Sequence, residues 1–120
     1  RRVINADGRM CFTVIRLADG LKGPTMDRAV KAGPQFIRSE GHYPSMLKSA
    51  GWQIIQQDDI TDAFLASTER MIAAEKKQSE SLRTLRGGEA NETAQVNWRS
   101  RLQAVADRLI LREFFSVVPA

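Results

Sequence analysis

The stretch Gly8-Arg-Met-Cys-Phe-Thr-Val-Ile-Arg-Leu17 decides the fold. Residues 10–15 are apolar except for Thr13, and turn-forming residues stand on either side, Asn5-Ala-Asp-Gly8 before the run and Ala18-Asp-Gly20 after it. A short apolar run that does not alternate and lies between turns is typical of a strand covered on both faces. We therefore expect an α/β fold in which this strand belongs to a sheet with helices on each side.

Two further strands are predicted to pair beside this one. Residues 52–57 alternate partly between apolar and polar, and residues 111–118 are rich in aromatic and β-branched side chains. Between the strands, a short helix is expected over 26–32. Another is expected from Pro44, which suits the first turn of a helix, to Gly51, which suits the position after its end.

The region between the second and third strands is predicted to form two amphipathic helices. The first opens after Asp58-Asp59-Ile60 with Thr61 as its N-cap, and it continues to the glycine pair Gly87-Gly88. Asp58 and Asp59 are adjacent on a strand and point to opposite faces, so capping of the helix by Asp59 or Thr61 is a better account than a shared carboxylate site. The second helix covers 92–110, and we expect the two to close as an antiparallel pair.

Composition narrows the class of protein. The 120 residues are 42% hydrophobic and 27% charged, which fits a single globular domain. The net charge is +4, but the charges of both signs are mixed and no basic run carries aromatics, so no nucleic-acid partner is expected. No apolar run approaches the roughly 20 residues that cross a bilayer, so no membrane partner is expected either.

The single cysteine and the single histidine exclude an intrachain disulfide and a zinc site. Because Cys11 lies inside the apolar strand, we expect it to be buried. Because it cannot form an intrachain disulfide, we expect the protein to reside in the reducing cytoplasm. One cysteine and one histidine cannot supply a zinc site, and no metal ligands are predicted. The chain begins at Arg1 without an initiator methionine, which favours a piece of a longer protein.

The order of these motifs resembles one family. A turn and apolar strand, Ala50-Gly51-Trp52 leading into a strand, Asp59-Ile60-Thr61 opening a helical pair and an aromatic-rich last strand are similar to the C-terminal half of a class I S-adenosylmethionine-dependent methyltransferase of the small-molecule type. On this resemblance, the predicted strands are strands five, six and seven of a Rossmann-like sheet, with the seventh antiparallel between the other two. Residues 1–120 would be the C-terminal part of a methyltransferase domain, with residues 62–110 as a helical lid.

The resemblance also implies that part of the enzyme is missing from this chain. The family's cofactor loop is glycine-rich, follows the first strand, and is paired with an acidic residue at the end of the second. This sequence has no Gly-x-Gly-x-x-Gly and no spare strand–helix unit. S-adenosylmethionine would therefore be bound mainly by residues outside the chain, no cofactor-binding residue is assigned within it, and the fragment alone would be inactive.

If part of the sheet is missing, one strand edge should be left unpaired. The strand over 10–17 has only the last strand to flank it closely, which leaves one apolar edge open. Open edges of this kind associate with other chains. We expect a homodimer or a pairing with the missing N-terminal half.

The candidate site residues lie in loops and in the helical pair. His42 falls at the carboxyl side of the sheet, where α/β proteins bind ligands, and is the candidate general base; the alternative is an exposed loop histidine. Arg16 and Asp19 would lie at the same rim, as a loop salt bridge by default. Contacts to the acceptor are assigned to four residues that could instead serve in packing or on the surface: Tyr43, Phe64, Arg70 and Trp98.

The resulting functional hypothesis is the acceptor-side portion of a methyltransferase that acts on a small molecule. The resemblance implies in-line attack of an acceptor atom on the sulfonium methyl group, with catalysis mostly by positioning. The alternative is a non-catalytic helical module, in which residues 62–110 dock a partner protein or an anionic surface.

Overall fold

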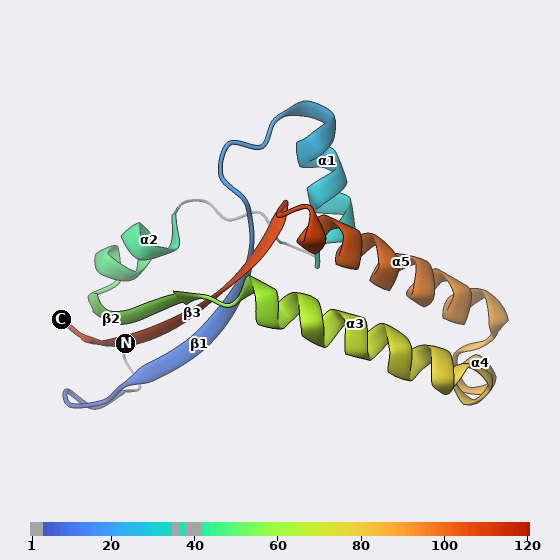
Figure 1. Cartoon of the computed structure of the whole chain (residues 1–120). Coiled ribbons are helices and arrows are strands. Elements are labelled where there is room, and N and C mark those ends of the chain that lie inside the picture. The colour runs from blue at the N-terminus through green and yellow to red at the C-terminus, as the bar shows by residue number, and fades with distance from the viewer. Residues whose placement is uncertain (1–3, 35–36, 38–41) are drawn as a thin grey trace.

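The structure, a computed structural model, describes residues 4–34, 37 and 42–120. Helices and strands follow one another along these residues as shown in Figure 1: β1 (Met10–Leu17), α1 (Gly23–Ala32), α2 (Tyr43–Ser49), β2 (Trp52–Asp59), α3 (Thr61–Lys77), α4 (Ser79–Arg86), α5 (Gly88–Ala106) and β3 (Ile110–Pro119).

The strands form one sheet in the order β1-β3-β2, and β3 is antiparallel to both neighbours. β1 and β2 are therefore parallel to each other. This confirms the predicted α/β class and the insertion of the last strand between the other two. Among the described strands, β1 lies at an edge of the sheet with one side unpaired, as expected.

Two strands are longer than predicted. β2 continues to Asp59 because Asp58 and Asp59 pair with Phe114 and Glu113 in the ladder, after a shift of register between Ile54 and Gln56. β3 continues to Pro119, which faces Trp52 at the end of the ladder, where the missing proline N–H removes no interior hydrogen bond.

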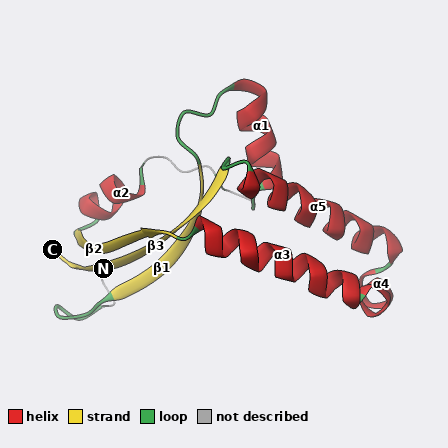
Figure 2. Ribbon diagram, viewed as in Figure 1, coloured by secondary structure: helices red, strands yellow, loops and turns green. Residues whose placement is uncertain are grey.

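Apolar residues pack in two clusters. In the first, α2 covers one face of the sheet (Figure 2). Tyr43 and Leu47 pack there against the buried Trp52, Phe115 and Val117. The second joins the helices to the carboxyl end of the sheet, and its buried members are Ala32, Ile37, Phe64, Ala104, Val105 and Ile110. Apolar side chains thus fix α2 on the sheet and anchor α1, α3 and α5 at its end.

The prediction that β1 is covered on both faces is wrong. Cys11 and Thr13 are exposed, whereas Phe12 is half-buried and stacks on Phe115 with ring centroids 5.4 Å apart. Burial therefore alternates along the first half of the strand. In the described part of the chain, α2 covers the Phe12 face and the Cys11 face stays open.

The helical region is an antiparallel pair, as predicted, but its boundaries differ. The first helix divides at Gln78 into α3 and α4, and α5 runs from Gly88 to Ala106 rather than over 92–110. Gly87, with φ of +87°, makes the turn before α5. α1 begins at Gly23 rather than at residue 26, since a proline in its first turn needs no N–H partner.

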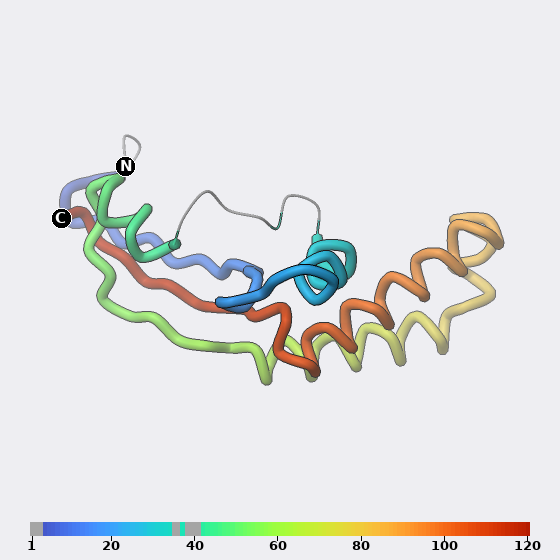
Figure 3. Tube along the Cα trace, turned by 90° about the horizontal axis from the view of Figure 1, so that it is seen from above, coloured from blue at the N-terminus to red at the C-terminus, as the bar shows by residue number. Residues whose placement is uncertain are grey.

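The molecule is elongated, because α3 and α5 run side by side away from the sheet, with α4 at the far end (Figure 3). The Cα radius of gyration is 17.3 Å. A compact domain of this length would have a radius of roughly 14 Å. The sheet and the helical pair are therefore not wrapped around one common core.

The side chain that caps the N-terminus of α3 is that of Asp59 rather than that of Thr61. Its carboxylate accepts hydrogen bonds from the backbone N–H of Thr61, at 2.8 Å, and from the Thr61 hydroxyl. These bonds, first the hydroxyl and then the backbone bond, lower the pKa of the Asp59 carboxyl group. The buried Thr61 oxygen in turn accepts the N–H of Arg112 at 3.1 Å, which ties the helix start to β3.

Glu113 is a buried charge at the centre of the sheet. It lies on β3, is 6% exposed, and accepts hydrogen bonds from Arg16 Nε on β1 and from Gln57 Nε2 on β2, the latter at 2.8 Å. One carboxylate thus joins all three strands on the face that also carries Phe115. Because both of its oxygens have partners, the cost of burying the charge is offset.

We expect Asp59→Ala to lower the free energy of unfolding by about 0.5–2 kcal/mol at pH 7, the usual value of a helix-capping bond. Because the pKa of Asp59 is lower in the folded state, its contribution is complete above the unfolded pKa and disappears as the pH falls through the folded pKa. Urea unfolding of the full chain at pH 7 and near pH 3 should show the difference shrinking in acid. Asp58→Ala is the matched control, and an equal loss in both variants would contradict the capping role.

Glu113→Ala should lower the free energy of unfolding by about 3 kcal/mol, because Arg16 and Gln57 lose their shared acceptor inside the sheet. Urea unfolding checks this against Glu80→Ala, which removes an exposed carboxylate from α4. A loss no larger than that of the control would show that the sheet does not depend on this carboxylate.

Candidate functional site

The candidate site lies at the carboxyl edge of the sheet. β1 and β2 are parallel and end there, at Leu17 and Asp59, and β3 begins there at Ile110. Ligands of α/β proteins bind outside the carboxyl ends of such strands. α3 starts directly after β2, and α5 leads directly into β3, so the helical pair stands on the same edge (Figure 1).

A chain of polar contacts leads from inside the sheet to this edge. Glu113 holds the guanidinium of Arg16, whose Nη1 lies 3.0 Å from the carbonyl oxygen of Leu17 and 3.6 Å from Asp19 Oδ1. The same Asp19 oxygen lies 3.9 Å from His42 Nε2. The predicted gathering of Arg16, Asp19 and His42 at one rim is therefore observed.

His42 stands immediately before α2 and is well exposed, with 62% of its side chain accessible. Asp19 is also exposed, so the contact is an open one at the rim. A carboxylate beside an imidazole can fix which ring nitrogen carries the proton, and the other nitrogen is then able to accept one. The arrangement fits both alternatives stated for His42, because an exposed loop histidine can also serve as a base.

Tyr43 and Phe64 lie in different apolar clusters. Tyr43 is half-buried, and its ring centroid lies 6.3 Å from that of Phe115 in the cluster beneath α2. Phe64 is 7% exposed in the cluster at the helix junction, with the guanidinium carbon of Arg112 5.2 Å from its ring centroid. Both side chains have a packing role, and their contact with an acceptor stays a prediction.

Arg70 and Trp98 lie midway along the helical pair. Arg70 is exposed on α3 and donates a hydrogen bond of 3.3 Å to Ser67. Trp98 is half-buried on α5 and lines a cavity of about 290 Å³ between α3 and α5, together with Glu75. The structure thus brings His42 to the carboxyl edge with Asp19, and it places Arg70 and Trp98 out along the helices.

Sequence reasoning missed Glu113 and Gln57. A signal for Glu113 was present, because it is two and four residues before Phe115 and Val117 and so shares their face of the strand. A carboxylate on that face needs a buried partner. Gln57 carried no such signal, since its role follows from the pairing of β2 with β3.

The described residues contain no group of three or more His, Cys, Asp or Glu side chains placed to hold a metal ion. No helix among them combines the length and the apolarity that crossing a membrane requires. They also do not fit S-adenosylmethionine by themselves, because no described strand leads through a glycine-rich Gly-x-Gly-x-x-Gly turn into a helix.

No family model matches the chain, and no curated protein sequence matches it either. Solved structures do match. Phosphoethanolamine N-methyltransferase 2 of Haemonchus contortus, in complex with phosphomonomethylethanolamine and S-adenosylhomocysteine, matches 98% of this chain with a TM-score of 0.81 at 18% identity, and 28% of that protein is covered.

Two further solved structures agree with this one. A proposed sarcosine dimethylglycine methyltransferase of Galdieria sulphuraria matches 98% of this chain with a TM-score of 0.82 at 15% identity, and 43% of it is covered. The cyclopropane synthase MmaA2 of Mycobacterium tuberculosis matches 97% with a TM-score of 0.79 at 12% identity, and 46% of it is covered.

This chain therefore spans less than half the length of each of these three proteins. The match extends over nearly all of the chain, and its strand order is the one expected for strands five, seven and six. The predicted resemblance is thus confirmed for the fold: the chain has the fold of the C-terminal part of a class I S-adenosylmethionine-dependent methyltransferase.

Proposed function

We propose that this chain is the acceptor-side portion of a cytoplasmic S-adenosylmethionine-dependent methyltransferase that acts on a small molecule. The fold supports this proposal, as does the small-molecule complex of the Haemonchus contortus enzyme. The observation that carries it is the contact between Asp19 and His42 at the carboxyl edge of the sheet. An ionisable pair at that edge stands where an α/β fold exposes a bound ligand.

In this proposal His42 is the general base. Asp19 Oδ1, 3.9 Å from Nε2, favours the tautomer that carries its proton on Nε2, which leaves Nδ1 to accept the proton of an acceptor hydroxyl or amine. The electron pair of the O–H or N–H bond then stays on the acceptor atom, which becomes the nucleophile, and the imidazolium later releases the proton to water. Asp19 stabilises that imidazolium, and Arg16 keeps Asp19 within reach.

The remaining assigned residues would contact the acceptor. Tyr43 follows His42 directly, and Phe64 lies in the first turns of α3 near the same edge. Arg70 and Trp98 belong to the helical pair, the proposed lid. A lid that closes over an acceptor excludes water and orients the nucleophile.

The methyl donor, in this proposal, is bound by residues outside the chain. The free side of β1 is where a further strand of the complete sheet would pair, either from an N-terminal half or from a second copy. This accounts for the exposed Cys11 face, which the rest of the protein would cover. It also accounts for the elongated shape, because this chain would then be only part of a larger domain.

We expect His42→Ala to lower kcat about 100-fold in the protein that carries this chain in its full reading frame, because general bases typically contribute that much or more. Transfer of a labelled methyl group to a panel of small hydroxyl and amine compounds is the measurement. Asp19→Asn should lower kcat less and alter its pH profile. Ser45→Ala, an exposed change on α2, is the control. An unchanged rate and pH profile in His42→Ala would exclude the base role.

The chain by itself should show no heat of binding with S-adenosylhomocysteine in titration calorimetry, whereas the protein from the full reading frame should bind it. Circular dichroism of the same sample confirms that the chain is folded. Tight binding by the chain alone would contradict the proposal that the donor site lies elsewhere.

A second candidate function is a non-catalytic helical interaction module. Exposed apolar residues on the helical pair favour it, above all Leu85, which is 82% exposed on α4. The coding sequence upstream of Arg1 discriminates between the two: a glycine-rich strand–loop–helix unit supports the enzyme, and an unrelated domain supports the module.

A further inference from the structure

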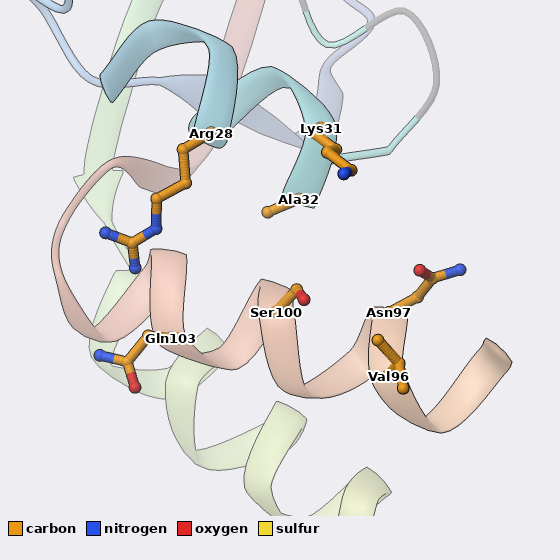
Figure 4. Close-up of a pocket in the computed structure, with 7 residues that line it drawn as sticks. All are labelled: Arg28, Lys31, Ala32, Val96, Asn97, Ser100 and Gln103. Carbon is orange, nitrogen blue, oxygen red and sulfur yellow. The ribbon is translucent and has the colours of Figure 1, made fainter. Parts of the chain in front are cut away.

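A cleft lies between α1 and α5, apart from the polar contacts at the carboxyl edge. Its volume is about 350 Å³, within the range of small-molecule sites. Figure 4 shows the two helices facing each other across it, with these residues lining it: Arg28, Lys31, Ala32, Val96, Asn97, Ser100 and Gln103. None of them belongs to the Glu113–Arg16–Asp19–His42 contacts.

The wall formed by α1 is cationic. Arg28 and Lys31 are three residues apart and therefore lie on the same side of the helix. Arg28 is fixed in place by Asp107, whose Oδ2 accepts its Nη2 at 2.5 Å. The Arg28 bond, and after it the bond from Gln103, lower the pKa of the Asp107 carboxyl group, so this anchor stays ionised at neutral pH.

The wall formed by α5 carries neutral hydrogen-bonding groups. Asn97, Ser100 and Gln103 follow one another at intervals of three residues on α5 and line the cleft. They supply two amides and a hydroxyl, and the Gln103 amide already donates a hydrogen bond of 3.0 Å to Asp107 Oδ1. Amide N–H and hydroxyl groups can donate to oxygen atoms of a ligand. Ala32 and Val96 add a short apolar surface, which suits a small carbon skeleton.

The two walls are held together by a further contact. Arg101 on α5 donates a hydrogen bond of 3.3 Å to the carbonyl oxygen of Ala32 in the last turn of α1. This bond satisfies a carbonyl that would otherwise direct negative potential toward the cleft. The residues that line the cleft include two cations and no carboxylate.

We infer that the cleft between α1 and α5 binds a small organic oxyanion, a phosphate or carboxylate group on a short carbon skeleton. The Lys31 ammonium supplies the principal charge, because Arg28 already shares its charge with Asp107. Ser100 and Asn97 donate to the remaining oxygens. Charge-assisted hydrogen bonds of this kind are the strong ones in anion recognition. The inference does not depend on methyl transfer.

Titration of the ¹⁵N-labelled full chain by NMR tests the inference at constant ionic strength. The probes are inorganic phosphate, glycerol phosphate and glycerate, which separate a phosphate site from a carboxylate site. We expect at least one probe to shift the side-chain amide signals of Asn97 and Gln103 in a saturable way. Lys31→Gln should weaken that binding about tenfold, as expected for the loss of one charged hydrogen bond. Ser100→Ala should weaken it as well.

Lys48→Gln is the matched control, because it removes the same charge from an exposed position on α2. It should leave the affinity unchanged. Equal weakening by Lys31→Gln and Lys48→Gln would show a general attraction of anions to a basic protein and overturn the inference. The absence of a saturable shift with all three probes would overturn it too.

Discussion

β3 is a partner in both pairs of hydrogen-bonded strands in the described sheet, and the rest of the structure depends on that constraint. β1 and β2 run parallel and do not touch in the ladder, so the antiparallel β3 must lie between them to join them. β3 also supplies the buried Phe115, around which one apolar cluster forms, and Glu113, which holds Arg16 and Gln57. The contacts that lead outward to Asp19 and His42 therefore begin on the last strand of the chain.

Much of this arrangement was predictable, but by different routes. Apolar runs and turn residues located the three strands and the helical pair, because those signals are local. The order β1-β3-β2 came from the resemblance of motifs to a family, since periodicity alone does not state which strands pair. The C-terminal end of β2 was misjudged because Asp58 and Asp59 bond through their backbones, and backbone pairing takes place even where polar side chains suggest a turn.

The residues of the site likewise divide into those that the sequence indicates and those that depend on the packing of distant elements. His42 and Asp19 were both expected at the carboxyl edge, since both lie in loops that follow the first predicted strand, and they are 3.9 Å apart. Glu113 could have been found from the face that it shares with Phe115. The cleft of Lys31 and Ser100 could not, because it results from the packing of α1 against α5, two helices far apart in the sequence with no motif that links them. Cys11 was misplaced because an apolar strand was assumed to have both faces covered within this chain.

The open face of β1, which carries Cys11, has a practical consequence. The 120 residues contain a single thiol, and among the described hydrogen bonds it contacts only the Ser116 hydroxyl. Alkylation of a sulfhydryl requires access of the reagent, so the rate at which Cys11 is modified reports how far this surface is occluded. Cys11 is therefore a built-in footprinting probe for the face of β1 that the rest of the protein is proposed to cover.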